Sequence, residues 1–362
     1  MSIFLSCGEA SGDNLLSSLA LSLREQGYHG PLWGMGGPSS QAAGVECLWP
    51  SSELHIMGIT QALKALPRLN GLADRICDEI IRRKPSKVVV ADSPDFHIPL
   101  VRRLRRRGYG GKTIFLSPPT VWAWRKGRVV PLRELFDLCL PLFGFEDRYL
   151  RSYGVTSSWI GHPMVDSFGP PSPPPGDGVV ALLPGSRKSE VSSLLPVLLD
   201  LSRGLKKAGL RPVFSVAPSF HGAFRDDLLK KLQGQKVFTG DALDLIERSD
   251  LVVGASGTVA VEAMMARRFM VVLYRSGALE WFVYRNFIKL PYISIPNVMT
   301  GRSLFPERLQ DRCNPSAIWG DIRSFMASKC RRERVYRGLD LARSKMGSPG
   351  AKVFWAKSVI EL

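Results

Sequence analysis

The chain has 362 residues, 45% of them hydrophobic and 22% charged, which is the composition of an ordinary globular protein and a length that favours two domains. Lys and Arg outnumber Asp and Glu by 49 to 32, and the net charge of +17 predicts an anionic partner such as nucleic acid, a phosphorylated ligand or an acidic membrane surface. No uninterrupted apolar run reaches about 18 residues, which argues against a membrane-spanning helix.

The cysteines, the histidines and the first residues argue against several further classes. Six cysteines are scattered without a C-x-x-C pair, which fits a reducing cytoplasm better than a disulfide framework. The opening MSIFLSCGEASGD lacks a basic start, and its apolar run is too short for a signal peptide. Five histidines show no metal-ligand spacing and no G-x-S-x-G elbow occurs, so the sequence gives little support to a metal centre or a serine hydrolase.

Short β-branched or aromatic segments alternate with helical patterns along the chain. In the first half, strands are expected at Ser2–Ser6, Val88–Asp92, Thr113–Ser117, Leu138–Leu142 and Ser157–Ile160. In the second half, they are expected at Val179–Leu183, Pro212–Val216, Lys236–Thr239, Leu251–Gly254, Met270–Tyr274 and Tyr292–Ile295. This alternation predicts βαβ units and therefore an α/β protein of two doubly wound, Rossmann-like domains, which bind ligands at the carboxyl ends of their strands and face each other across a cleft.

A proline-rich segment separates the two expected domains. Residues 168–178, FGPPSPPPGDG, contain five prolines, cannot continue either sheet and are predicted to form a semi-rigid linker. The first domain is then expected at 1–167 and the second at 179–340. The remaining residues, 341–362, are expected to form a C-terminal helix that packs back on the first domain.

Two acids stand among small residues directly after the first expected strand. The stretch SCGEASGD contains Glu9 and Asp13 at the point where a helix should begin. Asp13 has a structural explanation as an acid of the first helical turn, which the helix dipole favours. The pattern alone gives no role to Glu9.

Two segments combine apolar and basic residues in a way that suits a membrane surface. In HIMGITQALKALPRL, Ile59, Leu63 and Leu66 recur at helical spacing beside lysine and arginine. Such an amphipathic stretch can lie in a membrane surface, and packing into the protein core is the alternative. The aromatic and basic segment Leu279–Ile293 is another candidate for contact with acyl chains.

The stretch VVVADSPDFHIPL ends a buried strand with two carboxylates. Pro94 is expected to keep Ser93 extended, which would end the strand and leave Asp92 and Asp95 at its carboxyl edge. Carboxylates in this place suit a general base or a metal site, and helix capping is the alternative.

Aromatic and basic residues follow the next strand, in SPPTVWAWRKGR. Trp122 and Trp124, with Arg125 and Arg128, could line an apolar pocket with a basic rim. Aromatic residues interleaved with arginine also stack nucleic-acid bases, but no RNA- or DNA-binding motif supports that alternative.

The stretch LLPGSRKSE leaves the first strand of the second domain. Gly185 permits a tight turn, and Ser186 is expected to cap the next helix with its amides free. Those amides and Arg187 suit a phosphate, although the motif is not a Walker A loop and a plain helix cap is the alternative.

A second strand–turn–helix segment, GASGTVAVEAMMA, repeats this pattern. Ser256, Gly257 and Thr258 leave the N-terminus of the next helix open to a diphosphate. Glu262 lies about one turn further along, where a carboxylate can accept both hydroxyls of a ribose. Two such turns in one domain strengthen the prediction of a nucleotide site.

Together these segments resemble the lipid-A-disaccharide synthases, which are family 19 glycosyltransferases of the GT-B class. The resemblance covers nearly the whole chain in eleven blocks in order, among them CGEASGD, DSPDF, VWAWR, FEDRYLRSYGV, IGHPMVD, LLPGSR, ASGTVAVEAM, ISIPN and GRSLFPERLQ. It implies an inverting transfer of 2,3-diacylglucosamine from UDP-2,3-diacylglucosamine to the 6-hydroxyl of 2,3-diacylglucosamine 1-phosphate. The products would be UDP and a β-1,6-linked tetraacyl disaccharide 1-phosphate of lipid A.

The resemblance also implies roles for individual residues. Asp92 is the expected base, with Asp95 as runner-up or orienting partner. Glu9 would hold a hydroxyl of the acceptor in a turn formed with Gly8, Ser11 and Gly12. The remaining substrate-binding residues implied by the motifs are Trp122 in the apolar pocket, Ser186, Arg187, Ser256, Gly257 and Thr258 at the diphosphate, Glu262 at the ribose, Asn297 at the sugar or phosphate, and Arg302, Glu307 and Gln310 in roles left open.

The implied setting is the inner face of the cytoplasmic membrane, with the protein cytoplasmic and peripherally bound to anionic lipid. No cofactor and no metal is expected besides the UDP-sugar donor, and no nucleic-acid partner. The sequence leaves a homodimer as an option. The alternative function is another GT-B UDP-sugar transferase acting on a lipid-linked acceptor, and more distant rivals are a UDP-sugar epimerase and a basic nucleic-acid-binding protein.

Overall fold

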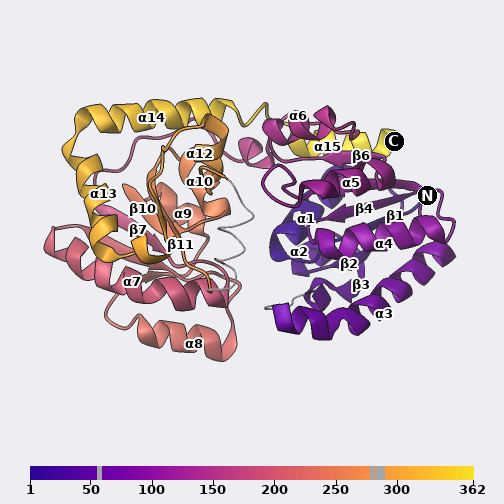
Figure 1. Cartoon of the computed structure of the whole chain (residues 1–362), viewed down its shortest axis with the longest axis horizontal. Coiled ribbons are helices and arrows are strands. Elements are labelled where there is room, and N and C mark those ends of the chain that lie inside the picture. Colours follow the sequence, from indigo (N-terminus) through magenta and orange to yellow (C-terminus); the bar gives the residue numbers. More distant parts are fainter. Residues whose placement is uncertain (55–58, 278–280, 282–289) are drawn as a thin grey trace. The chain divides into compact units, whose positions relative to one another are not determined.

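The computed structural model describes residues 1–54, 59–277, 281 and 290–362 (Figure 1). It divides into two compact units, the first made of Met1–Ser167 and Met346–Leu362 and the second of Phe168–Lys345. The expected membrane segments lie partly outside the described residues: residues 55–58 of the first, with the side chains of 59–64, and residues 279–280 and 282–289 of the second.

The first unit contains a six-stranded parallel sheet in the order β3-β2-β1-β4-β5-β6. The strands are β1 (Ile3–Ser6), β2 (Leu32–Gly36), β3 (Glu46–Pro50), β4 (Lys87–Ala91), β5 (Lys112–Leu116) and β6 (Leu138–Leu140). The chain reverses its direction of winding between β1 and β4. In doubly wound sheets a reversal of this kind opens a crevice at the carboxyl ends of the two strands, where ligands bind.

Helices cover both faces of this sheet. They are α1 (Ala10–Glu25), α2 (Pro38–Ala42), α3 (Ile59–Arg83), α4 (Pro94–Arg106), α5 (Val129–Leu135), α6 (Gly144–Ser152) and α15 (Ala351–Glu361), with short 3₁₀ turns η1 (Ser51–Leu54), η2 (Lys126–Arg128) and η3 (Pro163–Asp166). One apolar core lies between the sheet and α3, α4 and α5, and a second lies between the sheet and α1 and α15. Both faces of the sheet are therefore covered by apolar side chains, as is usual for a parallel sheet.

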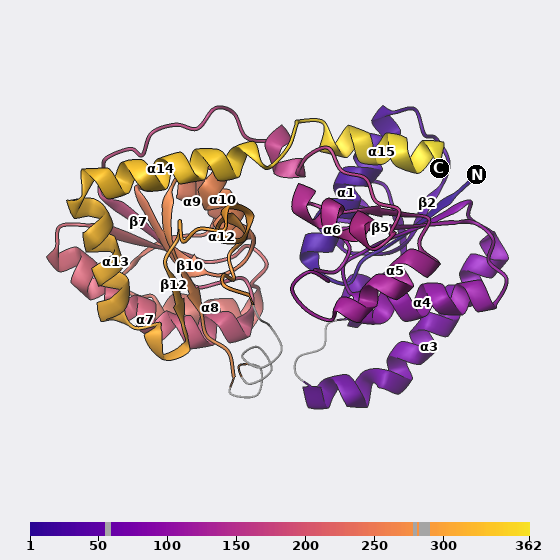
Figure 2. The same ribbon diagram turned by 45° about the horizontal axis from the view of Figure 1, so that its top comes forward.

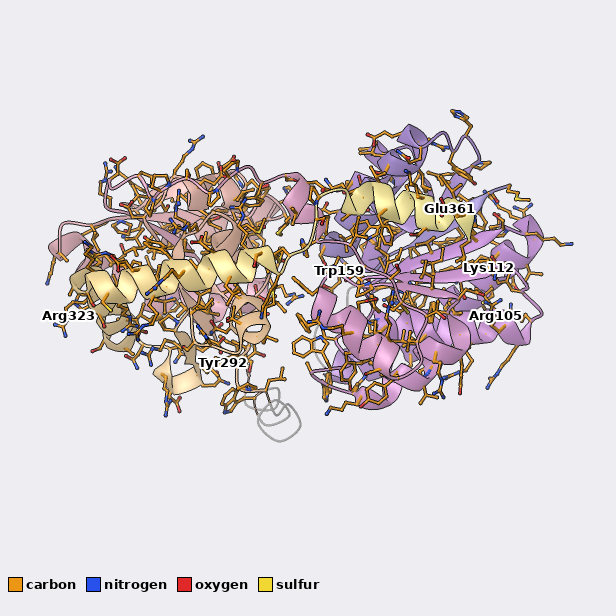
Figure 3. The ribbon with its side chains drawn as sticks, turned by 90° about the horizontal axis from the view of Figure 1, so that it is seen from above. Arg105, Lys112, Trp159, Tyr292, Arg323 and Glu361 are labelled. Atoms are coloured by element: carbon orange, nitrogen blue, oxygen red, sulfur yellow. The ribbon has the colours of Figure 1, made fainter. Side chains whose placement is uncertain are left out.

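The last helix belongs to the first unit although the second unit precedes it in the chain. Trp355, Ala356 and Val359 of α15 are buried in the core that also contains the leucines of α1. The amide of Gly350 donates to Asp166, and Lys87 donates to the carbonyl of Ile360 near the labelled Glu361 (Figure 3). Helix α15 therefore completes the layer on the α1 face of the first sheet.

The second unit repeats the topology in its own parallel sheet, ordered β12-β11-β10-β7-β8-β9. Its strands are β7 (Val179–Leu183), β8 (Arg211–Ser215), β9 (Lys236–Phe238), β10 (Leu251–Ala255), β11 (Phe269–Tyr274) and β12 (Glu307–Leu309). Its helices are α7 (Lys188–Lys207), α8 (Gly222–Lys231), α9 (Ala242–Glu247), α10 (Thr258–Met265), α12 (Ile295–Thr300), α13 (Pro315–Ala327) and α14 (Lys329–Ser344), with the 3₁₀ turn η4 (Gln310–Arg312). Helix α7 packs on α13, and α9, α12 and α14 pack on α10 (Figure 2). The reversal of winding falls here between β7 and β10.

Two charged residues form hydrogen bonds between the proline-rich segment and the rest of the second unit. Asp250 accepts hydrogen bonds from the amides of Gly176 and Gly178. The guanidinium of Arg268, which is 1% exposed, donates to the carbonyl of Ser172. These bonds restrain the segment more than its composition alone predicts.

The prediction of two Rossmann-like α/β folds is confirmed, but not every expected strand exists. Ser157 forms only an isolated bridge with Cys139 where a strand was expected at 157–160. At 292–295 no strand forms, because Ile295 begins α12 and the following proline takes a first-turn helix position. Strands β2, β3 and β12, in contrast, were not foreseen.

Candidate functional site

The carboxyl ends of β1 and β4 bring Asp92 against the N-terminus of α1. Its carboxylate accepts hydrogen bonds from the amide of Gly8, at 2.8 Å, and from the amide of Glu9, at 3.0 Å. A Cβ on Gly12 would lie 1.8 Å from Oδ2 of Asp92, and a Cβ on Gly8 would lie 2.2 Å from the Ser93 hydroxyl. The two glycines of the sequence CGEASGD therefore make room for Asp92 and Ser93.

The backbone at Asp92 departs from the expected extended form. Asp92 has a φ of 52° and Ser93 a φ of 40°, so both residues are left-handed. The expectation that Pro94 keeps Ser93 extended was therefore wrong. The restriction before proline acts against the right-handed helical region, and here the chain uses the left-handed one instead. Non-glycine residues avoid this conformation unless their surroundings enforce it, and such residues cluster at functional sites.

The electrostatics of Asp92 suit proton transfer. Burial raises the pKa of Asp92 to about 6, and the carboxylate of Glu9 raises it further, whereas hydrogen bonds from Ser93, Gly8 and Glu9 lower it. A carboxylate with this pKa is mostly ionised at pH 7 and is a stronger base than an exposed aspartate. A general base works best when its pKa is close to the working pH.

Asp95, the other candidate base, has a different environment. Its side chain is 75% exposed and pairs with Arg125, at 2.7 Å, and with Arg128. Two arginines thus engage the exposed carboxylate of Asp95, whereas the carboxylate of Asp92 lies against two backbone amides. The geometry therefore favours Asp92 as the base, and the two arginines of the expected basic rim are engaged with Asp95.

The tryptophans after β5 meet residues that follow β6. The indole of Trp122 donates to the carboxylate of Glu146 at 2.9 Å and makes an edge contact with Phe145 at 5.0 Å between ring centroids. Burial raises the pKa of Glu146 to about 7, and the indole hydrogen bond lowers it. Trp124 is half-exposed beneath the guanidinium of Arg125. The aromatic surface expected around Trp122 thus contacts Glu146, which the sequence pattern did not single out.

The two acids of the first loop have separate surroundings. The side chain of Glu9 is exposed at the N-terminus of α1, beside the exposed Ser11. Asp13 is buried and accepts hydrogen bonds from the amides of Gly37, Ser39 and Ser40. Asp13 therefore caps α2, whereas Glu9 faces solvent close to Asp92.

In the second unit, the turn after β7 already holds a carboxylate. Gly185 has a φ of 113°, and Glu190 accepts hydrogen bonds from the amides of Ser186, at 3.1 Å, and Arg187, at 3.3 Å. Arg187 is the residue that precedes α7, so the expectation that Ser186 caps this helix with its amides free was wrong. An anion at these amides would have to displace Glu190.

In the turn after β10, no hydrogen bond within the described part of the chain joins a carboxylate to the amides at the N-terminus of the next helix. Gly257 has a φ of 149° and precedes α10, which begins at Thr258. Among the described residues, Oε2 of Glu262 is buried and makes no hydrogen bond. Burial raises the pKa of Glu262 to about 7, and Asp241 raises it further. A buried oxygen in this state is stabilised by any ligand that donates a hydrogen bond to it.

Asn297 does not offer its side chain to a ligand. It is fully buried, accepts from the amides of Leu304 and Phe305, and donates to the Phe305 carbonyl and to Glu307. The expected contact with sugar or phosphate is therefore absent from this geometry. Asn297 instead fixes the turn that follows α12.

The remaining expected site residues also secure loops. Glu307 accepts from the amides of Ile293 and Ser294, and Gln310 both accepts from the Ser276 amide and donates to its carbonyl. These bonds hold the two ends of the segment between β11 and α12. Arg302 is exposed on the loop that follows α12.

Much of the positive charge on the first unit is paired. Arg103 and Arg107 of the α4 region contact Asp74 on α3. Arg105 and Lys112, both labelled in Figure 3, pair with Asp137. On the described part of α3, by contrast, Leu66 is 50% exposed. The described residues contain no helix long and apolar enough to cross a membrane, and no group of three or more His, Cys, Asp or Glu side chains placed to hold a metal.

Comparison with known proteins agrees with these features. A family model described as Lipid-A-disaccharide synthetase matches residues 3–334. A Lipid-A-disaccharide synthase of Myxococcus xanthus is 32% identical over 378 residues, covering 99% of this chain and 97% of its own, and one of Pseudomonas aeruginosa is 36% identical over 333 residues, covering 87% of each. The solved UDP-GlcNAc 2-epimerase of Neisseria meningitidis bound to UDP-GlcNAc shares the fold, with a TM-score of 0.66 and 11% identity over the whole of both chains.

Proposed function

The chain belongs to the lipid-A-disaccharide synthetase family and is a glycosyltransferase of lipid A biosynthesis, and from this premise we propose its substrates and its mechanism. The donor is UDP-2,3-diacylglucosamine and the acceptor is 2,3-diacylglucosamine 1-phosphate. The enzyme joins them through a β-1,6 linkage and releases UDP. The observation that carries the proposal is the ionisable carboxylate of Asp92, held at the carboxyl edge of the first sheet.

Asp92 acts as the general base of this reaction. Its carboxylate removes the proton from the 6-hydroxyl of the acceptor while that oxygen attacks the anomeric carbon of the donor. The bond from the anomeric carbon to the diphosphate breaks on the opposite face, so the configuration inverts. The amides of Gly8 and Glu9 hold the carboxylate in place and favour its unprotonated form, which general-base catalysis requires.

The donor's nucleotide binds in the second unit, at the turns after β7 and β10. The open N-terminus of α10, at Ser256–Thr258, stabilises the charge that develops on the leaving diphosphate. Arg187 adds a charge-assisted contact, and a phosphate oxygen replaces the carboxylate of Glu190 at the turn amides. Glu262 accepts the ribose hydroxyls, which supply the donors that its buried oxygen lacks in the described structure.

The other residues expected to bind substrate divide into two groups. Glu9 and Ser11 lie exposed at the N-terminus of α1, where the amide of Glu9 contacts Asp92, and they bind hydroxyls of the acceptor. Trp122 contributes an apolar surface. Asn297, Glu307 and Gln310 act at a distance by holding the loops of the second unit, and Arg302 remains available to a phosphate. Transfer is expected without a metal, by resemblance to GT-B enzymes, and unchanged activity in EDTA would support this.

The protein binds the inner face of the cytoplasmic membrane through the N-terminal part of α3. The exposed Leu66 and the net charge of +17 support this proposal, because both substrates are lipids and basic residues near anionic lipid contribute about 1 kcal/mol each. Sedimentation with vesicles should show stronger binding to phosphatidylglycerol than to phosphatidylcholine. Equal binding to both, or none, would contradict the proposal.

The identity of the reaction can be tested with purified protein and defined substrates. Each candidate lipid acceptor is supplied separately with its UDP-sugar donor, and the products are identified by mass spectrometry. The proposal predicts the tetraacyl disaccharide 1-phosphate only when both diacylglucosamine substrates are present. Product from another lipid-linked acceptor alone, or turnover of the donor without acceptor, would contradict it.

A further inference from the structure

A buried histidine on α4 connects the ends of β1 and β4 beneath Asp92. His97 is fully buried, and its Nε2 lies 2.8 Å from the hydroxyl oxygen of Ser6, the last residue of β1. Its Nδ1 lies 2.9 Å from the backbone carbonyl oxygen of Asp92. The ring thus spans the point where the first sheet reverses its winding.

The chemistry of the two contacts determines the tautomer of His97. A carbonyl oxygen can only accept, so Nδ1 carries the proton and donates it to Asp92. In a neutral ring Nε2 is then the acceptor, and the hydroxyl of Ser6 must donate to it. Burial lowers the pKa of His97 to about 4, so the ring stays neutral over the range in which enzymes of this kind work.

The hydrogen bond from His97 to Asp92 lies where the backbone conformation is unfavourable for a non-glycine residue. Asp92 and Ser93 are consecutive non-glycine residues in the left-handed region, a conformation that persists only when several contacts enforce it. The amide of His97 bonds to the carbonyl of Ser93, and its ring bonds to the carbonyl of Asp92. His97 therefore holds both carbonyls of the left-handed pair.

We propose that His97 is a positioning residue for Asp92: its Nδ1 proton holds residue 92 in the left-handed conformation that directs the carboxylate toward the amides of Gly8 and Glu9. This inference rests on the proposed role of Asp92 as the base. His97 itself is buried and touches no substrate. A loss of the bond would let the carboxylate shift, and a misplacement of about 1 Å at a reacting group can cost about 100-fold in rate.

Two substitutions separate the two contacts of the ring. The carboxamide nitrogen of His97→Asn can replace Nδ1 and keep the bond to Asp92, whereas the carboxamide of His97→Gln reaches the place of Nε2 and keeps only the contact with Ser6. We expect His97→Asn to retain kcat within about threefold of the wild type and His97→Gln to lose about 100-fold in kcat. KM for the acceptor and the Kd of UDP should change little in either variant, because neither side chain touches a ligand.

The outcomes distinguish this inference from a histidine that merely fills the core. Equal kcat for the two variants, whether high or low, would overturn the positioning role. Asp92→Asn is measured in parallel, and if that variant kept wild-type kcat, the proposed base would be wrong and the inference with it. If His97→Gln fails to fold, His97→Asn carries the test: kcat within about threefold of the wild type supports the inference, and a loss of about 100-fold overturns it. An Nε2–H tautomer at His97 in ¹⁵N spectra of histidine-labelled wild-type protein would also overturn it.

Discussion

Glycine at position 12 is expected to be essential for activity, because it leaves the space that the carboxylate of Asp92 occupies. In Gly12→Ala the new Cβ would lie 1.8 Å from Oδ2 and 2.7 Å from Cγ of Asp92. Real Cβ contacts are not shorter than 3.0 Å, so the carboxylate must move away by about 1.2 Å. Even then, the Cβ and Oδ2 would be closer together than the optimum of about 3.5 Å for contacts between carbon atoms. Its hydrogen bonds to Gly8 and Glu9, now 2.8 and 3.0 Å, would then exceed the usual range.

The expected loss of activity follows from that displacement. A shift of this size at a reacting group costs about 100-fold in kcat, or about 2.7 kcal/mol in the activation free energy. The free energy of unfolding should change less, because alanine is favoured over glycine in a helix by about 1 kcal/mol, which offsets part of the lost hydrogen bonding. UDP affinity should not change, because the proposed nucleotide site lies in the other unit.

The assay measures kcat, UDP affinity and thermal stability for Gly12→Ala and for a matched control. Gly204→Ala is that control: Gly204 lies in the interior of α7, is exposed, and its Cβ would meet no atom within 4 Å. The control should keep wild-type kcat and gain up to about 1 kcal/mol in stability. A Gly12→Ala variant that folds and keeps wild-type kcat would show that catalysis does not need the carboxylate of Asp92 in its observed place.

Three further predictions concern the two proposed binding regions. Because only the ionised form of Asp92 can accept a proton and its pKa is about 6, kcat/KM should fall about tenfold per pH unit below pH 6 and stay level from pH 7 to 8; a profile level down to pH 5 would contradict this role. Uridine, which carries no phosphate, should bind more tightly as pH rises from 6 to 8, because the ribose hydroxyls favour the ionised form of Glu262, whose pKa is about 7. Glu262→Gln should weaken uridine binding and remove its pH dependence. An unaltered pH profile of binding in that variant would refute the ribose contact. Arg187→Ala should raise the Kd of UDP about tenfold while leaving that of uridine unchanged, as measured by calorimetry, since the lost contact is a charge-assisted bond to phosphate; equal effects on both ligands would place Arg187 elsewhere.

The sequence foretells those parts of the site that depend on local pattern. Strands β1, β7 and β10 are each followed by a turn of small residues and a helix. The structure places these three turns at the two reversals of winding. The sequence could not give the strand order, which depends on pairing between distant segments. Strands β2 and β3 escaped prediction because LWGMG and ECLWP contain glycine, proline and tryptophan, without a clear period of two.

The missed contacts depend on residues that are remote in sequence. The left-handed turn at Asp92 and Ser93 is enforced by Gly8, Glu9 and His97, and no rule on the residue before a proline includes them. Asn297 resembled a ligand-binding residue because of its motif, yet its amide is fully used within the fold.

Two further acidic residues, Glu190 and Glu146, make contacts that were not predicted from the sequence. Glu190 lies one turn after Ser186 and Arg187 and therefore reaches back to their amides, which occupies a turn that was expected to be open. Glu146 gains its contact with Trp122 only when the loops after β5 and β6 meet. Such partners can be identified only once the fold is known.

The most direct test of the proposed mechanism is the turnover of Asp92→Asn with both diacylglucosamine substrates, measured beside its affinity for UDP. The account predicts that kcat falls by a factor of about 10² to 10⁴, the usual contribution of a general base, while the Kd of UDP stays at the wild-type value. Turnover near the wild-type rate would contradict it, and the proton acceptor would then have to be sought elsewhere in the first unit, beginning with Asp95.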